Sequence, residues 1–378
     1  MTNKVYKRLT MFRIYFLFLF AAILVFDGHT QSNQEQTVRP VKIGLLISDK
    51  KSVAAKNGAE LAISEANEKG GFNGRPFELV VRSMEGPWGT GAKEAVNMIF
   101  NDEVCAIMGS TDGRNAHLVE QVATKSHVIF LSAWAGDPTL SQAFVPWFFS
   151  CVPNNNQQAS ALVEEICRKQ NISRVGMVSD QEYDSQSALK SFLKKVKMAG
   201  KPDPVQFSLD GSDRDLADLL NQMAKADLKG AVLFVKPESA LKIIQQMQAK
   251  NMNIPVFSTL SVLDENKVSN SEMKTMENRI QVTSSPWLKT KRSPFNDEFQ
   301  KKYGNVPGTV ATFAYDGMNL LIEAIKKSGL DREKIQKGLS EIHYEGVTGL
   351  IQFDQKGNRS GSLIVTPVKK GSPAILEK

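Results

Sequence analysis

The chain has 378 residues, of which 42% are hydrophobic and 23% are charged, and its formal net charge at pH 7 is +7. This length allows two ordinary domains with substantial cores, and the composition is that of a globular protein. The basic excess is mild and spread along the chain, without an arginine-rich stripe or interleaved aromatic residues. The composition therefore argues against nucleic acid as a partner.

The amino-terminal residues carry an export pattern. Four basic residues precede an uninterrupted apolar run over 14–26, and a polar segment follows it. This order is typical of a secretory signal peptide, which we assign to residues 1–32. The run is shorter than the roughly 20 residues of a membrane span, although retention as an uncleaved anchor is the alternative. No cysteine follows the run, so we expect a periplasmic or otherwise exported protein without a lipid anchor.

From residue 41 onward, short β-rich runs alternate with helical segments. The first series has strand patterns at 41–47, 77–83, 104–109 and 128–132, with helical patterns at 57–71, 91–101 and 115–126. The run at 147–152 begins a second series, with strand patterns at 174–180, 204–209, 230–235 and 254–259, and helical patterns at 156–169, 185–198, 214–226 and 238–250. Such alternation predicts parallel sheets with helices on both faces, and two series predict two similar lobes.

After residue 282 the rhythm changes. Helical patterns at 310–329 and 331–341 are followed by a hairpin-like segment over 351–368, in which QKGN is a turn signal between two strand patterns. This tail has too few strands for a third lobe, so we expect it to complete both existing ones.

The sequence carries no recognisable catalytic or metal-binding motif. We find no phosphate loop, dinucleotide fingerprint, zinc-protease motif or nucleophile elbow. The histidines do not cluster, and the cysteine spacings match no metal site. Cys105 fits a small core residue, whereas Cys151 and Cys167 either pair or stay free. We therefore predict no enzyme activity, no cofactor and no metal.

Five motifs in chain order carry a family resemblance over about residues 40 to 368. They are GAELAISEANEKGGFNGRPFELVVRS, LSAWAGDPTLS, VGMVSDQEYDSQ, ATFAYDGMNLLIEAIKKSG and GLIQFDQKGNR. Together they resemble the type I periplasmic binding proteins, the leucine/isoleucine/valine-binding branch of the substrate-binding proteins of ABC transporters. In these motifs Gly70 and Gly71 end a helix where a positive φ is expected. Asp316 is expected to hold backbone donors at the lobe connection, and Gly357 to form a turn.

The resemblance implies an α/β fold of two doubly wound parallel-sheet lobes joined by a three-stranded hinge. We expect an N-terminal lobe of 40–150 plus 285–343, a C-terminal lobe of 151–284 plus 344–378, and crossovers near 150–153, 281–286 and 343–349. Such proteins trap a solute between the lobes by hinge closure, with contacts at the carboxyl ends of parallel strands.

The resemblance also implies first-lobe ligand contacts. In amino-acid-binding members, a serine after the third strand holds the ligand carboxylate, and the loop after the fourth strand adds further groups. The matching positions here are Ser110, Thr111, Asp112, Gly113, Ser132, Ala133, Trp134 and Gly136. Asp112 either contacts the ligand or only caps the following helix. Trp134 either stacks on the ligand or is an ordinary core residue.

Other positions depart from the family pattern. Tyr183 is either a second-lobe aromatic over the ligand or a plain surface residue, and Lys51 and Trp88 are candidates for the mouth of the cleft. The acidic residue that often holds a ligand ammonium has no equivalent, because Leu260 takes its place. The clamp for an amino acid is therefore incomplete, and an amide, a polyol or an aromatic acid are alternatives.

These observations predict an exported solute-binding protein that delivers a small polar ligand, an amino acid or a similar small organic solute, to the permease of an ABC transporter. The alternative is a sensing module of the same fold that acts through a separate receptor or signalling partner. A third possibility is a degenerate member whose cleft binds nothing. We expect a monomer without a nucleic acid partner.

Overall fold

The structure, a computed structural model, describes residues 39–142, 145–210, 213–290 and 293–369. The described residues from Pro40 onward belong to one compact unit. The predicted signal peptide, residues 1–32, lies outside the described residues. Among the described residues, no helix has the length and apolar character needed to cross a membrane.

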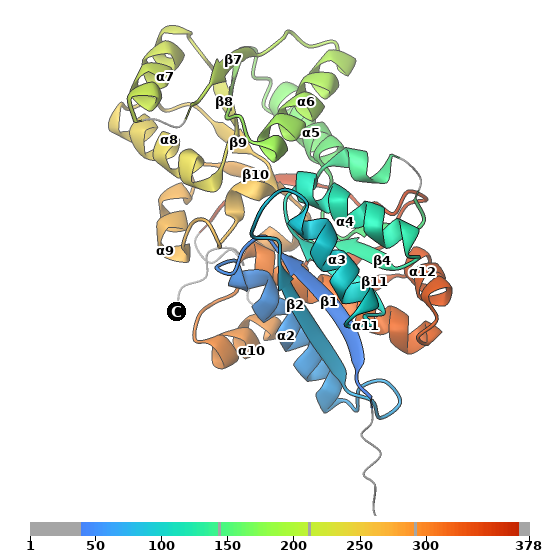
Figure 1. The fold of residues 1–378 in the computed structure, drawn as a ribbon. Helices are drawn as coiled ribbons and strands as arrows, with labels where there is room; N and C mark the ends of the chain where they lie inside the picture. The colour runs from blue at the N-terminus through green and yellow to red at the C-terminus, as the bar shows by residue number, and fades with distance from the viewer. Residues whose placement is uncertain (1–38, 143–144, 211–212, 291–292, 370–378) are drawn as a thin grey trace, which may run out of the picture. The chain divides into compact units, whose positions relative to one another are not determined.

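The first lobe is built on a five-stranded, all-parallel sheet (Figure 1). Its strands, in spatial order, are β2 (Phe77–Ser83), β1 (Val41–Ile47), β3 (Ala106–Ser110), β4 (Ile129–Ser132) and β5 (Phe148–Ser150). Strand β5 corrects one expectation, since the run at 147–152 closes the first series and does not begin the second. Its apolar pattern fits either sheet, and only its pairing with β4 decides between them.

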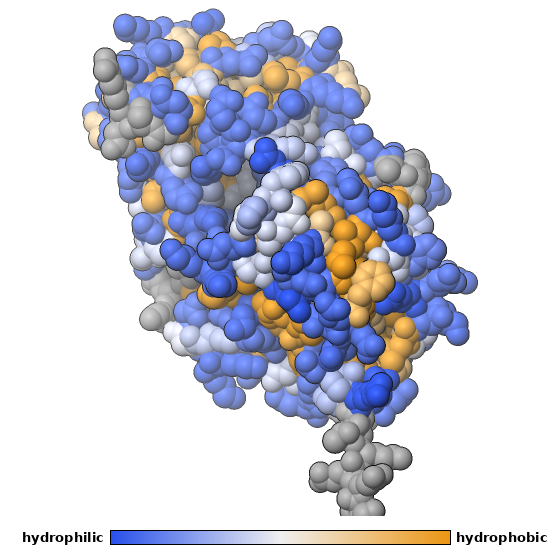
Figure 2. All heavy atoms as spheres, in the orientation of Figure 1, coloured by the Kyte–Doolittle hydropathy of each residue, from blue (hydrophilic) through white to orange (hydrophobic). Residues whose placement is uncertain are grey.

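Helices cover both faces of this sheet because alternate strand residues point to opposite sides. Leu45 packs in a core shared with α2 (Val53–Glu68) and α11 (Thr309–Ser328). Its neighbour Leu46 packs on the other side with α3 (Thr90–Phe100) and α4 (Gly113–Lys125). Figure 2 shows apolar residues gathered over α3 and α4, where Val96 and Phe100 are exposed.

The second lobe is built on a six-stranded sheet. Its strands, in spatial order, are β13 (Ile364–Pro367), β10 (Gln281–Ser284), β9 (Val256–Ser258), β8 (Gly230–Phe234), β6 (Val175–Ser179) and β7 (Val205–Ser208). Only the β10–β13 pair is antiparallel. One face packs against α5 (Asn155–Val163) and α6 (Tyr183–Met198), and the other against α7 (Asp213–Lys225) and α8 (Pro237–Ala249). A π-helical turn continues α5 to residue 169, and the short helix α9 spans Asn270–Met273.

The carboxyl-terminal segment completes both lobes, as predicted. Helices α10 (Pro294–Tyr303), α11 and α12 (Arg332–Ser340) supply side chains to the core of the first lobe, whereas β13 joins the second sheet. The predicted hairpin over 351–368 is wrong in its pairing. Strand β12 (Gly349–Ile351) pairs with β11 (Tyr344–Gly346), and β13 pairs with β10, where Val282 and Val365 are buried. The turn itself forms, with an isolated bridge between residues 353 and 359 and a φ of 76° at Gly357.

Buried polar contacts tie together the segments predicted to connect the lobes. Arg359, which is 6% exposed, donates hydrogen bonds to the carbonyl oxygens of Cys151, Thr348 and Leu350, at 2.9 to 3.1 Å. Ser285 also donates to the Thr348 carbonyl, at 2.7 Å. The Arg359 guanidinium thus joins the crossovers near 150–153 and 343–349, and the Thr348 carbonyl joins the latter to the crossover near 281–286. The exact lobe boundaries stay predictions.

Asp316 has the role expected of it. Its carboxylate accepts hydrogen bonds at 2.8 Å from the backbone N–H groups of Val347 and Thr348, and at 2.6 Å from the Thr348 hydroxyl. A Cβ on Gly346 would lie within 2.7 Å of both carboxylate oxygens, so only glycine allows this close approach.

The three cysteines are free. The alternative in which Cys151 and Cys167 pair is therefore wrong. Cys151 is fully buried in the first lobe, and Cys167 lies in the second lobe on the turn after α5. Burial raises the pKa of the Cys151 thiol to about 12, which keeps it protonated and unreactive.

Candidate functional site

The loops after β3 and β4 meet at the carboxyl edge of the first sheet. The parallel register pairs Ile47 with Ser110 and Gly109 with Ser132, and the Ala133 N–H donates to the Gly109 carbonyl at 2.8 Å. The structure thereby brings together the first-lobe residues that the family resemblance singled out: Ser110, Thr111, Asp112, Gly113, Ser132, Ala133, Trp134 and Gly136.

Asp112 is the N-cap of α4. Its backbone is extended, with φ −66° and ψ 164°, and its carboxylate accepts a hydrogen bond from the Asn115 N–H at 2.9 Å. The other carboxylate oxygen accepts from the Asn115 side-chain amide at 2.7 Å. These contacts satisfy one of the orphan N–H groups of the first helical turn. The capping role is thus present, and ligand contact by Asp112 stays a prediction.

The other polar groups of these loops are buried. Thr111 and Ser132 are each 1% exposed, and the Ser132 hydroxyl accepts from the Ala135 N–H at 3.1 Å. The Gly136 carbonyl accepts from the N–H of Asn155, at the start of α5, at 2.7 Å. Trp134 is partly buried and packs against the apolar cores of both lobes. The loop after β4 therefore lies where the two lobes meet.

Tyr183 reaches the first lobe from the start of α6. Its hydroxyl donates to Asp137 Oδ2 at 2.7 Å, and His117 Nε2 lies 3.2 Å from the same oxygen. Asp137 also accepts from the Thr139 N–H at 2.9 Å. Tyr183 is 39% exposed and forms an interlobe hydrogen bond, and its contact with a ligand stays a prediction.

The charges of this network are strongly coupled. Burial acts to raise the pKa of Asp137, yet hydrogen bonds from His117, Tyr183 and Thr139 outweigh it and hold that pKa well below its usual range. The bond to Asp137 in turn raises the pKa of His117. Burial and the Asp137 carboxylate raise the pKa of Tyr183 to about 12. The network therefore centres on an ionised Asp137 at neutral pH.

Asp184 makes a second contact between the lobes. Its Oδ1 accepts a hydrogen bond at 2.9 Å from the N–H of Gly113, the first residue of α4. Burial, together with the carboxylates of Asp112 and Asp137, raises the pKa of Asp184 to about 7. In the loop where the resemblance places a ligand carboxylate, the Gly113 N–H is bound by a carboxylate of the protein itself.

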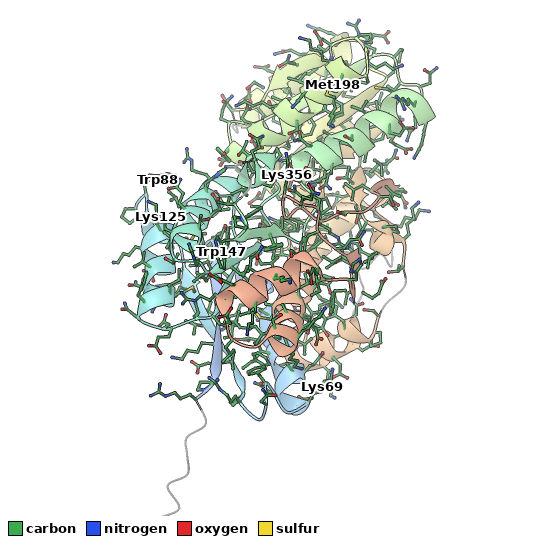
Figure 3. The ribbon with its side chains drawn as sticks, turned by 90° about the vertical axis from the view of Figure 1, so that its right-hand side faces the viewer. Lys69, Trp88, Lys125, Trp147, Met198 and Lys356 are labelled. Carbon is green, nitrogen blue, oxygen red and sulfur yellow. The ribbon has the colours of Figure 1, made fainter. Side chains whose placement is uncertain are left out.

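The two candidates for the mouth of the site lie in different surroundings. Lys51 is exposed and lines a cavity of about 680 Å³ that also has Asn57, Glu265 and Asn266 in its wall. Trp88 is 67% exposed at the outer edge of the first lobe (Figure 3), with the Arg114 guanidinium 5.2 Å from its ring centroid. Leu260, at the position of the family's acidic residue, is buried, and its N–H donates to Gln158 Oε1 at 2.9 Å.

Sequence reasoning missed the acidic residues that join the lobes. Asp137 and Asp184 lie inside two of the recognised motifs, next to Gly136 and Tyr183. Nothing in their spacing shows that each contacts a residue of the opposite lobe. Glu265 had no signal, although its carboxylate accepts hydrogen bonds at 2.8 Å from two N–H groups at the start of α11. In the described part of the chain, no group of three or more His, Cys, Asp or Glu residues is placed to hold a metal ion.

Two sheets, the first all parallel and the second parallel except for β13, are covered by helices and meet through loops at their carboxyl edges. This arrangement defines a two-lobed α/β binding protein. The model of the periplasmic binding protein family matches residues 40–372. The chain therefore belongs to that family, and its fold and the bacterial relatives reported below are those of non-enzymatic solute-binding proteins. The predictions of family, fold class and absence of enzyme activity are confirmed.

Known relatives are distant but cover most of the chain. This chain is 23% identical over 313 residues to the leucine-, isoleucine-, valine-, threonine- and alanine-binding protein of Pseudomonas aeruginosa. The alignment covers 80% of this chain and 81% of the relative. The structure matches the branched-chain amino acid transporter substrate-binding protein LivJ of Streptococcus pneumoniae, solved with isoleucine, with a TM-score of 0.74. That match covers 88% of this chain and 97% of LivJ at 21% identity.

A second solved structure is a solute-binding protein of an ABC transporter from Rhodopseudomonas palustris, in complex with 3,4-dihydroxybenzoic acid. Its TM-score is 0.73 at 20% identity, covering 88% of this chain and 94% of that protein. At these identities the structural matches establish the fold.

Proposed function

We propose that this protein is an exported solute-binding protein that captures a small polar ligand between its lobes and delivers it to an ABC-type permease. The observation that carries the proposal is the meeting of loops from opposite lobes. Gly113 and Asp137, at the carboxyl edge of the first sheet, bind Asp184 and Tyr183, which follow β6 of the second sheet. Open parallel sheets bind ligands at this edge.

The proposed ligand is an amino acid or a similar small organic solute. The name of the Pseudomonas relative specifies aliphatic amino acids and threonine, whereas the Rhodopseudomonas neighbour was solved with an aromatic acid. Proteins similar to this chain thus bind different ligands, and its incomplete amino-acid clamp is compatible with an amino acid or an aromatic acid. We assign the first-lobe contacts to the loops after β3 and β4, with Tyr183, Lys51 and Trp88 as further candidates.

Export is part of the proposal. The basic, apolar and polar order of residues 1–32 is that of a cleaved signal peptide, and membership of the periplasmic binding protein family supports the same destination. Mass spectrometry of the mature protein should then find an amino terminus near residue 33. An intact Met1 would overturn this part of the proposal.

A thermal-shift screen of the mature protein tests ligand capture. The panel comprises aliphatic and polar amino acids, amides, polyols and benzoic acids. A ligand present at 100 times its Kd stabilises the folded state by about 2.7 kcal/mol. For about 340 residues, this raises Tm by about 4 °C. No shift with any class would refute ligand capture and favour the degenerate alternative.

A matched pair of variants then locates the site. Thr111→Val removes a hydroxyl at the carboxyl edge of the first sheet with little change in volume, and should reduce the ligand-induced shift. Thr290→Val makes the same change beside Trp287, away from both loops, and should leave the shift unchanged. Equal ligand-induced shifts in Tm for both variants would show that the ligand does not bind at the loop after β3.

A further inference from the structure

Two carboxylates of the second lobe bind the starts of two helices of the first lobe. Asp184 Oδ1 accepts from the Gly113 N–H of α4 at 2.9 Å. Glu265 accepts from the N–H groups of Val310 and Ala311 in α11, each at 2.8 Å and each through a different oxygen. The first N–H groups of a helix have no partner inside the helix. Both contacts therefore bind the lobes through groups that helices leave unsatisfied.

Glycine makes room for each carboxylate. A Cβ on Gly113 would lie 2.9 Å from Asp184 Oδ1 and 2.8 Å from Asp137 Cβ. A Cβ on Gly308, the N-cap of α11, would lie 2.7 Å from both Cγ and Oε1 of Glu265. These separations are shorter than van der Waals contact. Neither glycine has a positive φ, so the close approach of the carboxylate, and not backbone conformation, is what a side chain would prevent.

We propose that Asp184 and Glu265 are positioning residues for ligand capture, which fix the closed arrangement of the lobes by docking at two separate points. The inference rests on the proposed function, in which the lobes close around a solute. It adds that the protein supplies its own carboxylate at the start of α4. A ligand carboxylate at that N–H group would have to displace Asp184.

The charges around both groups make this docking sensitive to pH. Asp184 faces Asp112 and Asp137 from the first lobe and Glu182 from its own helix. The neighbouring His117 and Tyr183 are engaged with Asp137. Burial is the largest cause that raises the pKa of Asp184 to about 7, from an ordinary value of 3.8.

Glu265 has a similar setting. Burial and the adjacent Asp264 raise its pKa to about 7, from an ordinary value of 4.5. The side chains of Lys51 and Lys274 line the same cavity, and Lys267 of the same loop lies 3.5 Å from Asp49 of the first lobe.

The direction of the pH effect follows from these shifts. A docked carboxylate with a raised pKa binds a proton more tightly than the same group exposed to water. Docking therefore takes up protons between about pH 4 and pH 7, so acid favours it, and it weakens as the pH rises toward 7. For each of the two groups, the equilibrium constant for docking should then fall roughly tenfold or more between pH 5 and pH 8.

Hydrogen exchange of single amides, resolved by NMR, measures the docking directly. The N–H groups of Gly113, Val310 and Ala311 are protected only while the second-lobe carboxylates bind them. After correction for the intrinsic exchange rate, we expect their protection to fall about tenfold or more between pH 5 and pH 8. The amide of Leu131, in the buried strand β4, reports global unfolding and should not follow this profile.

Substitutions separate charge from contact. Asp184→Asn keeps an acceptor oxygen without the charge, so Gly113 should stay protected and lose its pH dependence. Asp184→Ala removes the acceptor and should abolish that protection at every pH. Asp218→Asn, on the exposed side of α7, removes a carboxylate outside the contact and should leave the profile unchanged. Glu265→Ala should abolish the protection of Val310 and Ala311 while Gly113 retains its own.

Two results would overturn the inference. One is normal protection of Gly113 in Asp184→Ala while Leu131 shows an intact fold. The other is the wild-type pH profile in Asp184→Asn. Both readouts need no ligand, whereas the thermal-shift screen does. Docking without any solute-induced shift would refute the proposed function alone, and a solute-induced shift without docking would refute the inference alone.

Discussion

Replacement of Arg359 by alanine should strongly destabilise the connection between the lobes. The guanidinium donates four hydrogen bonds, to the carbonyls of Cys151, Thr348 and Leu350 and to the Thr348 hydroxyl, at 2.9 to 3.1 Å. The side chain also places its guanidinium 5.9 Å from the ring centroid of Phe313. Alanine would remove these contacts and take the guanidinium donor away from the buried Cys151 carbonyl, whereas the Thr348 carbonyl keeps the Ser285 hydroxyl.

The expected loss of unfolding free energy in Arg359→Ala follows from these hydrogen bonds and from the burial of the guanidinium. A hydrogen bond to a charged group contributes about 1.5–3 kcal/mol, but such bonds within one network are not additive. Burial lowers the pKa of Arg359, which reflects a desolvation cost that offsets part of the gain. Loss of one member of a buried charged network costs about 3–5 kcal/mol. We expect Arg359→Ala to lower the free energy of unfolding by about 4 kcal/mol.

Urea denaturation of the mature protein, followed by far-ultraviolet circular dichroism, measures this change. Arg359→Lys is the matched control, because it keeps the charge but cannot form the planar fork. It should lose about half as much stability. A loss below about 1 kcal/mol in Arg359→Ala would refute the reasoning that this residue joins two of the three predicted crossovers, at Cys151 and Thr348.

Three further changes have defined outcomes. Asp112→Ala removes the N-cap of α4 and should lower the free energy of unfolding by about 1 kcal/mol, while Asp112→Asn should retain most of it; a ligand-induced shift that survives in the alanine variant would limit Asp112 to capping. Asn67→Ala removes two hydrogen bonds to the backbone of Phe77, at 2.7 and 2.9 Å, and should cost about 2 kcal/mol in urea denaturation, so an unchanged midpoint would contradict this. Cys151 should resist a thiol reagent in the native protein and react only in urea, since it is fully buried; rapid native labelling at this residue, located by mass spectrometry, would show that the core opens.

Much of the fold could be predicted because its signals are local. The apolar runs at 41–47 and 77–83 coincide with β1 and β2, and the glycine pair at 70–71 ends the segment after α2 with positive φ at both residues. Asp316 was predicted to hold backbone donors at the lobe connection, and it does. The strands and the glycine pair depend on neighbours in the chain, whereas the role of Asp316, whose partners lie 31 and 32 residues away, was expected from the family resemblance.

Which distant strands pair with one another could not be predicted from the sequence. The run at 147–152 has an apolar pattern that fits either sheet, and only its hydrogen bonds with β4 place it in the first. Strand β13 pairs with β10, far away in sequence, and not with the nearer β12. A strand pattern specifies which faces are apolar, but not which edge the strand will join.

By itself, the sequence determined the two-lobed α/β class, the family and the two first-lobe loops of the candidate site, because periodicity and short motifs encode them. Only the tertiary structure decided what those loops contact. It directed Tyr183 to Asp137, and Asp184 and Glu265 to helix starts in the opposite lobe. Residues 113 and 184 are far apart in the chain, and a single carboxylate carries no record of its partner. Which N–H group it binds is fixed only when two independently packed sheets bring their carboxyl edges together.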